Sequence, residues 1–76
     1  MSKLPVLKTK ELIKVLNRMG FFQFHRVGSH TQFKHTDGKR TTIPIHYNKD
    51  IPRGTLMAIL KDIEISREEL IKILKK

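Results

Sequence analysis

The residues best suited to chemistry in this sequence are its four histidines, and one of them directly follows a tight-turn signal. In Gly28-Ser29-His30 the histidine comes first after a Gly-Ser pair, which is typical of a two-residue hairpin loop. An imidazole changes charge between about pH 5 and pH 8, so it can accept or donate a proton in a cell. Together with nearby cations, such a group is the minimum needed to cleave RNA without a metal, because the cations stabilise the charge that develops on the phosphorane.

The chain also carries a large excess of positive charge. Its 76 residues include 16 Lys and Arg against 7 Asp and Glu, which gives a formal charge of +9. The excess is present in each third of the chain, so we assign it to the folded surface and not to a disordered basic arm. Such a surface most often binds nucleic acid, while an anionic membrane and an acidic protein are the other partners that charge alone allows.

Length and composition limit the class of protein further. We expect a single domain, residues 1–76, and a hydrophobic fraction of 38% suits a globular chain. The absence of cysteine excludes disulfides, thiolate-bound zinc and a thiol nucleophile. No apolar run approaches the roughly 20 residues of a membrane span, and the N-terminus has no signal-peptide core, so we expect a cytoplasmic protein.

Three segments have the periodicity of helices. The first is 10–19, for which Thr9 is a candidate N-cap and Gly20 a C-terminal stop. The second begins near Pro52, at the position where proline costs a helix least. The third is short and begins with the capping box Ser66-Arg67-Glu68-Glu69.

The segment between the first two helices has the composition of β-strands. Turn signals at Gly28-Ser29 and Asp37-Gly38 divide it into three antiparallel strands, 21–27, 30–36 and 40–46. Pro44 has no N–H to donate, so the third strand should lie at an edge of the sheet. We therefore predict an α+β fold of order α-β-β-β-α that is similar to the double-stranded RNA-binding domain. Its three-stranded sheet carries the helices on one face, and a short extra helix follows at the C-terminus.

Alternation along these strands predicts two different faces, provided that Thr36-Asp37-Gly38 forms a three-residue loop. We expect the apolar face to hold Phe22, Phe24, Phe33, Ile43 and Ile45, and the polar face to hold Gln23, His25, His30, Gln32, Lys34, Thr42 and His46. With three phenylalanines in the core, only Tyr47 and Phe21 remain to stack on bases. The pattern therefore argues against a base-stacking platform and predicts weak sequence selectivity.

Several side chains are candidates for binding phosphate or RNA. They are Ser29 in the turn, the sheet-side cations Lys34, Lys39 and Arg40, the polar-face histidine His46, and Lys49 and Arg53 around the start of the second helix. His35 lies on the apolar parity near a turn and is expected to be structural or solvated. We expect no metal site, because no carboxylate accompanies the histidines of the polar face.

Four short blocks occur in order along most of the chain. They are Gly28-Ser29-His30-x-x-Phe33, Asp37-Gly38-Lys39-Arg40, Thr42-Ile43-Pro44-Ile45-His46 and Gly54-Thr55-Leu56-x-x-Ile59-Leu60. In this order they closely resemble the HicA family, the small mRNA-cleaving toxins of HicA/HicB toxin–antitoxin pairs. The resemblance runs from about Lys10 to Leu70, and the fold of the family, which is similar to a double-stranded RNA-binding domain, agrees with the predicted element order.

The resemblance implies a metal-independent endoribonuclease that cleaves mRNA, blocks translation, needs no cofactor and is neutralised by a HicB-type antitoxin. The family's catalytic histidine is the one in the Gly-Ser-His block, which is His30 here. Many relatives carry arginine five residues before it. This chain has His25 at that position, followed by Arg26, and both are candidate RNA contacts.

Two other functions are compatible with parts of the sequence. A non-catalytic RNA-binding module would keep the same fold and the same charge but perform no chemistry. Residues 51–74 could also form a helix-turn-helix that binds DNA, although Glu64, Glu68 and Glu69 around the start of its second helix would repel phosphates.

Overall fold

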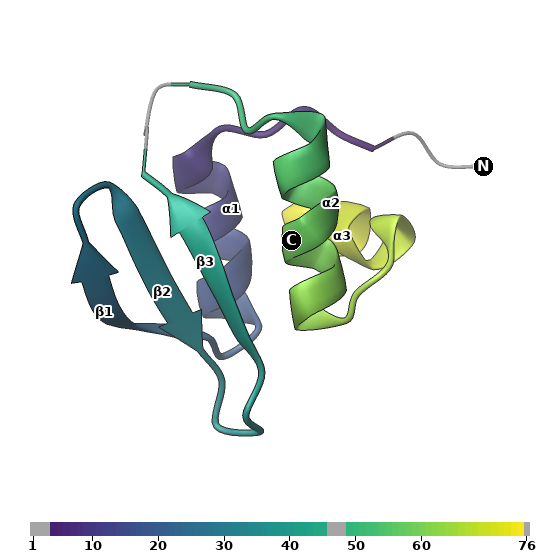
Figure 1. Ribbon diagram of the computed structural model, residues 1–76. Coiled ribbons are helices and arrows are strands. Elements are labelled where there is room, and N and C mark those ends of the chain that lie inside the picture. The colour runs from purple at the N-terminus through teal and green to yellow at the C-terminus, as the bar shows by residue number, and fades with distance from the viewer. Residues whose placement is uncertain (1–3, 46–48, 76) are drawn as a thin grey trace.

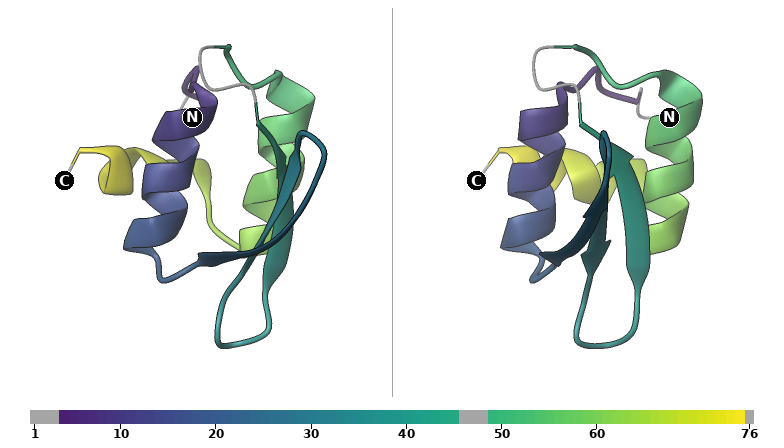
Figure 2. Two further views of the ribbon diagram at one scale, coloured as in Figure 1. Left: turned by 90° about the vertical axis from the view of Figure 1, so that its left-hand side faces the viewer. Right: turned by 60° about the vertical axis from the view of Figure 1, so that its left-hand side comes forward.

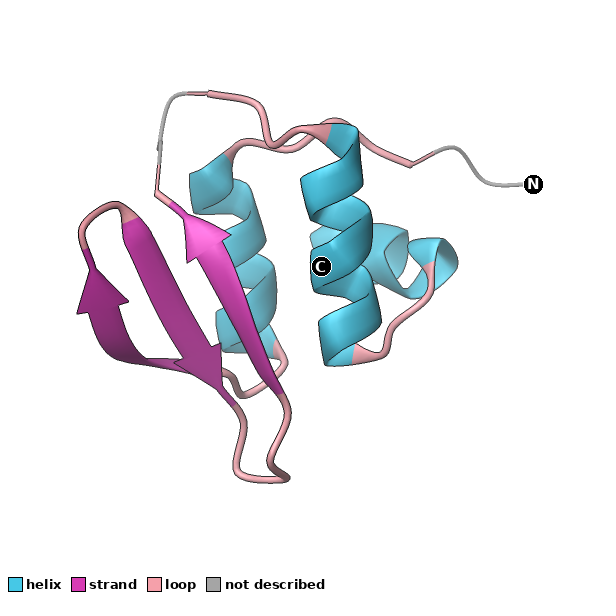
Figure 3. Ribbon diagram, in the orientation of Figure 1, coloured by secondary structure: helices cyan, strands magenta, loops and turns pink. Residues whose placement is uncertain are grey.

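The computed structural model describes residues 4–45 and 49–75 and has the predicted order of elements (Figure 1). The helices are α1 (Thr9–Arg18), α2 (Arg53–Ile63) and α3 (Arg67–Leu74), and the strands are β1 (Phe22–Val27), β2 (His30–Lys34) and β3 (Arg40–Pro44). The strands form one antiparallel sheet of order β1-β2-β3, which Figure 3 shows in magenta beside the cyan helices. The α+β fold predicted from the sequence is therefore confirmed.

The sheet is covered on one face only. Alternate residues of β2 and β3 are buried, namely Thr31 and Phe33 of β2 and Thr41 and Ile43 of β3. Helix α2 contacts β3, α3 packs against α1, and the two views of Figure 2 show the helices grouped beside the strands. Among the described residues, no helix lies on the other face of the sheet, so the side chains of that face are available to a ligand.

One hydrophobic core joins all three helices to the sheet. It takes Leu12, Val15 and Leu16 from α1, Leu56, Ile59, Leu60 and Ile63 from α2, Leu70 from α3, and Phe33, Ile43 and Ile45 from the sheet segment. Leu70 is fully buried and Arg18 Nη1 donates a hydrogen bond to the Ile73 carbonyl at 2.8 Å, so α3 is an integral part of the fold. Within the described residues, no helix is both long and apolar enough to cross a membrane.

The second hairpin has the loop that the hydrophobic pattern required. His35 N–H donates to the Lys39 carbonyl at 2.9 Å, which leaves Thr36, Asp37 and Gly38 as a three-residue loop. Gly38 has a φ of +98°, a left-handed conformation that glycine adopts without a Cβ clash. This odd loop length places Ile43 and Ile45 on the helix-facing side with Phe33, as predicted.

The predicted apolar face is wrong for β1. The register changes by one residue between Gln23 and His25, so Phe24 is the extra residue of a β-bulge and Gln23, not Phe24, pairs with Phe33. Phe22 pairs with Lys34 and is 45% exposed, and Phe24 is 42% exposed. The aromatic ring that fills the core at this end is Phe21, which was expected to be free but is only 3% exposed.

The N-terminal cap predicted from the sequence is present at α3 but not at α1. The Ser66 hydroxyl accepts from Glu69 N–H and the Glu69 carboxylate accepts from Ser66 N–H, both at 3.1 Å, so the predicted capping box is present. Thr9 is not the N-cap of α1: Lys8 holds that position and its N–H donates to Glu11 Oε1 at 3.0 Å. Thr9 instead turns into the protein, where it is buried and donates to the Pro44 carbonyl at 3.5 Å.

His35 joins the loop between β2 and β3 to the end of α1. Its Nδ1 accepts from the Asp37 N–H at 3.1 Å, so Nε2 carries the proton and donates to the Met19 carbonyl at 3.0 Å. The imidazole also lies edge-on to Phe21, with ring centres 5.0 Å apart. The predicted structural role of His35 is confirmed, because both of its ring nitrogens form hydrogen bonds within the fold.

Candidate active site on the open face of the sheet

His30 is the first residue of β2 and directly follows the turn of the first hairpin. Figure 1 shows this hairpin, which β1 and β2 form. Gly28 has a φ of +58° while Ser29 stays out of the positive-φ region, which is the pattern of a type II′ turn. The turn pairs His30 with Val27, and all four residues 27–30 are exposed. The predicted hairpin therefore presents the His30 imidazole to solvent from a fixed backbone position.

On its other side His30 is paired with Pro44 of β3. Ile45 N–H donates to the Ser29 carbonyl, so Ser29 and Ile45 form a hydrogen-bonded pair and the next pair, His30 with Pro44, does not exchange ladder hydrogen bonds. Pro44 thus loses nothing by having no N–H, and the predicted edge position of β3 is confirmed. Side chains of non-hydrogen-bonded pairs lie close together, so Pro44 is the cross-strand neighbour of His30.

The open face is defined here as the positions of the three strands whose side chains lie on the same side of the sheet as His30, away from the helices. By register these positions are Phe22, His25 and Val27 of β1, His30, Gln32 and Lys34 of β2, and Arg40, Thr42 and Pro44 of β3. The bulge residue Phe24 has no register partner and is placed on this face by the Lys34 ammonium, which lies over its ring. None of these ten residues is a carboxylic acid. The face therefore combines imidazoles, cations and aromatic rings, which is a suitable surface for a polyanion with exposed bases.

His25 is the second imidazole of the open face. It pairs with Gln32, two residues beyond His30 on β2, and it is exposed to solvent. Diagonal neighbours of this kind lie about 7–8 Å apart in an antiparallel sheet. Two imidazoles at that separation can flank a single phosphate group.

The cations of the open face lie at the opposite end of the sheet from His30. Lys34 and Arg40 are register partners, and Lys34 is four residues from His30 along β2, a distance of about 13 Å at the usual rise of a strand. Two of the predicted phosphate ligands, Lys34 and Arg40, are thus brought together on the same face as His30. Their distance from it indicates contacts with neighbouring nucleotides of an RNA chain.

Lys39 and Arg26 already have partners within the chain. Lys39 Nζ is 2.7 Å from Asp37 Oδ2, and this hydrogen bond lowers the pKa of the Asp37 carboxyl and raises the pKa of Lys39. Arg26 is the register partner of buried Thr31 but is itself exposed, and its Nε donates to the Gly28 carbonyl at 3.1 Å. Arg26 is thus held against the turn that carries His30, whereas Lys39 forms part of the second loop.

Of the other residues that were predicted to bind phosphate or RNA, some lie away from the open face and one lies outside the described residues. Lys49 and Arg53 are exposed around the start of α2, and neither belongs to the open face. His46 lies outside the described residues, as does Tyr47. Ser29 is exposed in the turn beside His30, where its hydroxyl is available to a phosphate.

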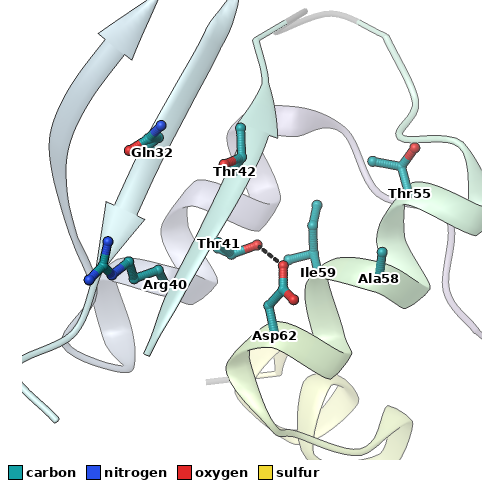
Figure 4. A pocket seen from close by; sticks show the side chains of 8 residues that line it. All are labelled: Gln32, Arg40, Thr41, Thr42, Thr55, Ala58, Ile59 and Asp62. Atoms are coloured by element: carbon teal, nitrogen blue, oxygen red, sulfur yellow. Dashed lines mark hydrogen bonds between the residues drawn. The ribbon is translucent and has the colours of Figure 1, made fainter. Parts of the chain in front are cut away.

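A groove of about 340 Å³ between β3 and α2 was not predicted from the sequence. Gln32, Arg40 and Thr42 line it from the sheet and Thr55, Ala58 and Asp62 line it from α2 (Figure 4). Thr41 Oγ1 donates to Asp62 Oδ2 at 3.1 Å across its floor. His30 does not line this groove, which reaches the open face only through the three sheet residues.

In the described part of the chain, no three His, Cys, Asp or Glu side chains are arranged to hold a metal ion.

Comparison with known proteins decides the family, since residues 9–65 match the model of the HicA toxin of bacterial toxin–antitoxin systems. The chain belongs to the HicA toxin family. The match covers about three quarters of the chain and includes the HicA Gly-Ser-His block, all three strands, α1 and α2. No curated protein matched the chain significantly.

Proposed function

We propose that this HicA-family toxin is an endoribonuclease that cleaves mRNA without a metal ion and so blocks translation in the cytoplasm. The observation that supports this most directly is the position of His30, exposed directly after a tight hairpin turn on a face with a second histidine and two cations. The function follows from a proton-transfer group placed on a surface that attracts phosphates.

The proposed reaction is a transfer of the phosphate from one ribose oxygen to another. His30 as the neutral imidazole accepts the proton of a ribose 2′-hydroxyl, and the 2′-oxygen forms a bond to the adjacent phosphorus. The bond from phosphorus to the 5′-oxygen breaks, and that oxygen takes a proton from an acid. The products are a 2′,3′-cyclic phosphate and a 5′-hydroxyl, with no change in oxidation state.

His25 is the side chain best placed to be that acid. It lies diagonally from His30 on the open face, and a protonated imidazole there can reach the far side of the same phosphate. Arg26, fixed to the Gly28 carbonyl, adds positive charge beside the turn. The arrangement uses an imidazole where relatives often have arginine.

The test is cleavage of single-stranded RNA by the purified toxin, with and without an excess of EDTA. We expect cleavage to continue in EDTA and the new 3′ ends to carry a cyclic phosphate, because the 2′-hydroxyl is the nucleophile. RNA in which the 2′-hydroxyls are methylated should not be cleaved. Binding of RNA with no cleavage of any substrate would contradict the proposal and indicate a non-catalytic RNA-binding module.

The neutralising partner is proposed to be a HicB-type antitoxin with an acidic surface that covers the open face. The chain is strongly basic and the cations Lys34 and Arg40 lie on the same face as His30, so one acidic protein can cover all three. We expect its Kd to rise several-fold when NaCl is raised from about 50 mM to about 300 mM, because salt screens exposed charges.

A charge-reversal pair tests where the antitoxin binds. Arg40→Glu should weaken binding more than Lys72→Glu, which makes the same change on exposed α3, away from the open face. Calorimetry of the toxin with its purified antitoxin measures both. Equal effects of the two substitutions would place the antitoxin elsewhere.

A further inference from the structure

The β-bulge in β1 turns two phenylalanines toward solvent on the same face as His30. A regular strand would have paired Phe24 with Phe33 on the helix-facing side, but the extra residue moves Phe24 out of the ladder. The Lys34 ammonium then lies over the Phe24 ring, 5.9 Å from its centre, and Phe22 is the register partner of the same lysine. Both rings therefore adjoin one cation on the open face.

The hydrophobic core is complete without the rings of Phe22 and Phe24. The core is closed at this end by Phe21, and the fully buried side chains of the described core include Phe33 but neither Phe22 nor Phe24. Bulges commonly re-aim side chains next to functional sites. Two half-exposed aromatic side chains on the same face as a candidate catalytic histidine thus indicate a binding function and not a packing one.

We propose that Phe22 and Phe24 form a base-stacking subsite for single-stranded RNA, with Lys34 and Arg40 bound to the flanking phosphates. This rests on the proposed function and names the form of RNA that the site takes. Every nucleobase has a π-face that stacks on an aromatic ring, and a positive charge beside the rings attracts the backbone. Only unpaired bases can reach the rings, so the subsite selects single strands over duplexes.

The distance between this subsite and His30 suits a short stretch of RNA. Lys34 and its partner Phe22 are about 13 Å from His30 along the sheet. That is the length of roughly four nucleotides at the stacked spacing of about 3.4 Å, and of fewer in an extended strand. A base held by Phe22 is therefore a few nucleotides from the cleaved bond, and a base held by Phe24, which directly precedes His25, is nearer to it. Stacking on the two rings fixes the position of that bond in the strand.

Binding of a 2′-O-methyl oligoribonucleotide tests the subsite separately from catalysis. Such RNA has no attacking hydroxyl, so an inactive toxin would still give a readable result. We expect Phe24→Ala and Phe22→Ala each to weaken binding roughly 5- to 100-fold, the usual effect of losing one stacked base. Met57→Ala is the matched control, because Met57 is 44% exposed on α2, and it should leave binding unchanged.

A second measurement reports on stacking itself. The chain has no tryptophan, so Phe24→Trp places a single fluorescent indole in the subsite. Its emission should be quenched by the 2′-O-methyl oligonucleotide but not by an abasic oligomer of the same length and charge, and binding should be retained. Equal binding of the two oligomers to the unchanged toxin would overturn the proposal. So would phenylalanine variants that bind RNA normally but lose the antitoxin, which would identify a protein-binding surface.

Discussion

Replacing His30 by alanine is expected to lower the rate of RNA cleavage by about 10²- to 10⁴-fold, the usual contribution of a positioned general base. The substitution should not change the melting temperature, because His30 is exposed at the start of β2 and lies outside the core. Expression of the unchanged toxin should arrest bacterial growth, and expression of His30→Ala should not. Timed cleavage of a labelled single-stranded RNA measures the rate directly.

His35→Ala is the matched control for that experiment. His35 joins the Met19 carbonyl to the Asp37 N–H inside the fold, so its removal should lower the melting temperature. Cleavage per folded molecule should remain. Growth arrest that survives His30→Ala undiminished, or a loss of cleavage that only accompanies unfolding, would contradict the assignment of His30.

Phe33→Ala is expected to have the largest effect on stability. Phe33 is 2% exposed and lies at the centre of the sheet's buried face, where truncation of a phenylalanine costs about 3–5 kcal/mol. A domain of this length has a free energy of unfolding of only about 4–11 kcal/mol. A large fraction of the stability is therefore lost, and the melting temperature should fall by roughly 12–40 °C.

The matched control is Phe24→Ala, which removes the same side chain from the neighbouring strand at 42% exposure. It should cost about 1 kcal/mol or less, because the ring is already in contact with water. Urea denaturation followed by circular dichroism measures both variants. If Phe24→Ala were as destabilising as Phe33→Ala, Phe24 would belong to the core after all.

The elements and the second hairpin could be predicted from the sequence because each depends on a local signal. Gly28-Ser29 and Gly38 set the two turns, and the Ser66-Glu69 pair sets the start of α3. Period-2 alternation then placed Ile43 and Ile45 correctly. His30 could be singled out for the same reason, since a histidine directly after a tight turn is visible in the sequence.

The bulge could not be predicted, because nothing in the local pattern around Phe24 distinguishes a regular strand from one with an extra residue. A register change of one residue reverses which side chains face the core, so Phe21 replaced Phe22 and Phe24 there. The contacts of Arg26 with Gly28 and of Lys39 with Asp37 depend on loop conformation. Thr9 was misplaced because its tertiary contact with Pro44 competes with capping.

The bulge also affects whether copies of the toxin can associate. β1 is an edge strand with exposed apolar side chains, and such an edge is a template for pairing with the strand of another molecule. An extra residue interrupts its row of N–H and C=O groups, so a second strand cannot continue along it in register. The irregularity that exposes Phe24 thereby protects the free toxin against edge-to-edge aggregation, and a deletion that restores regular alternation would remove that protection.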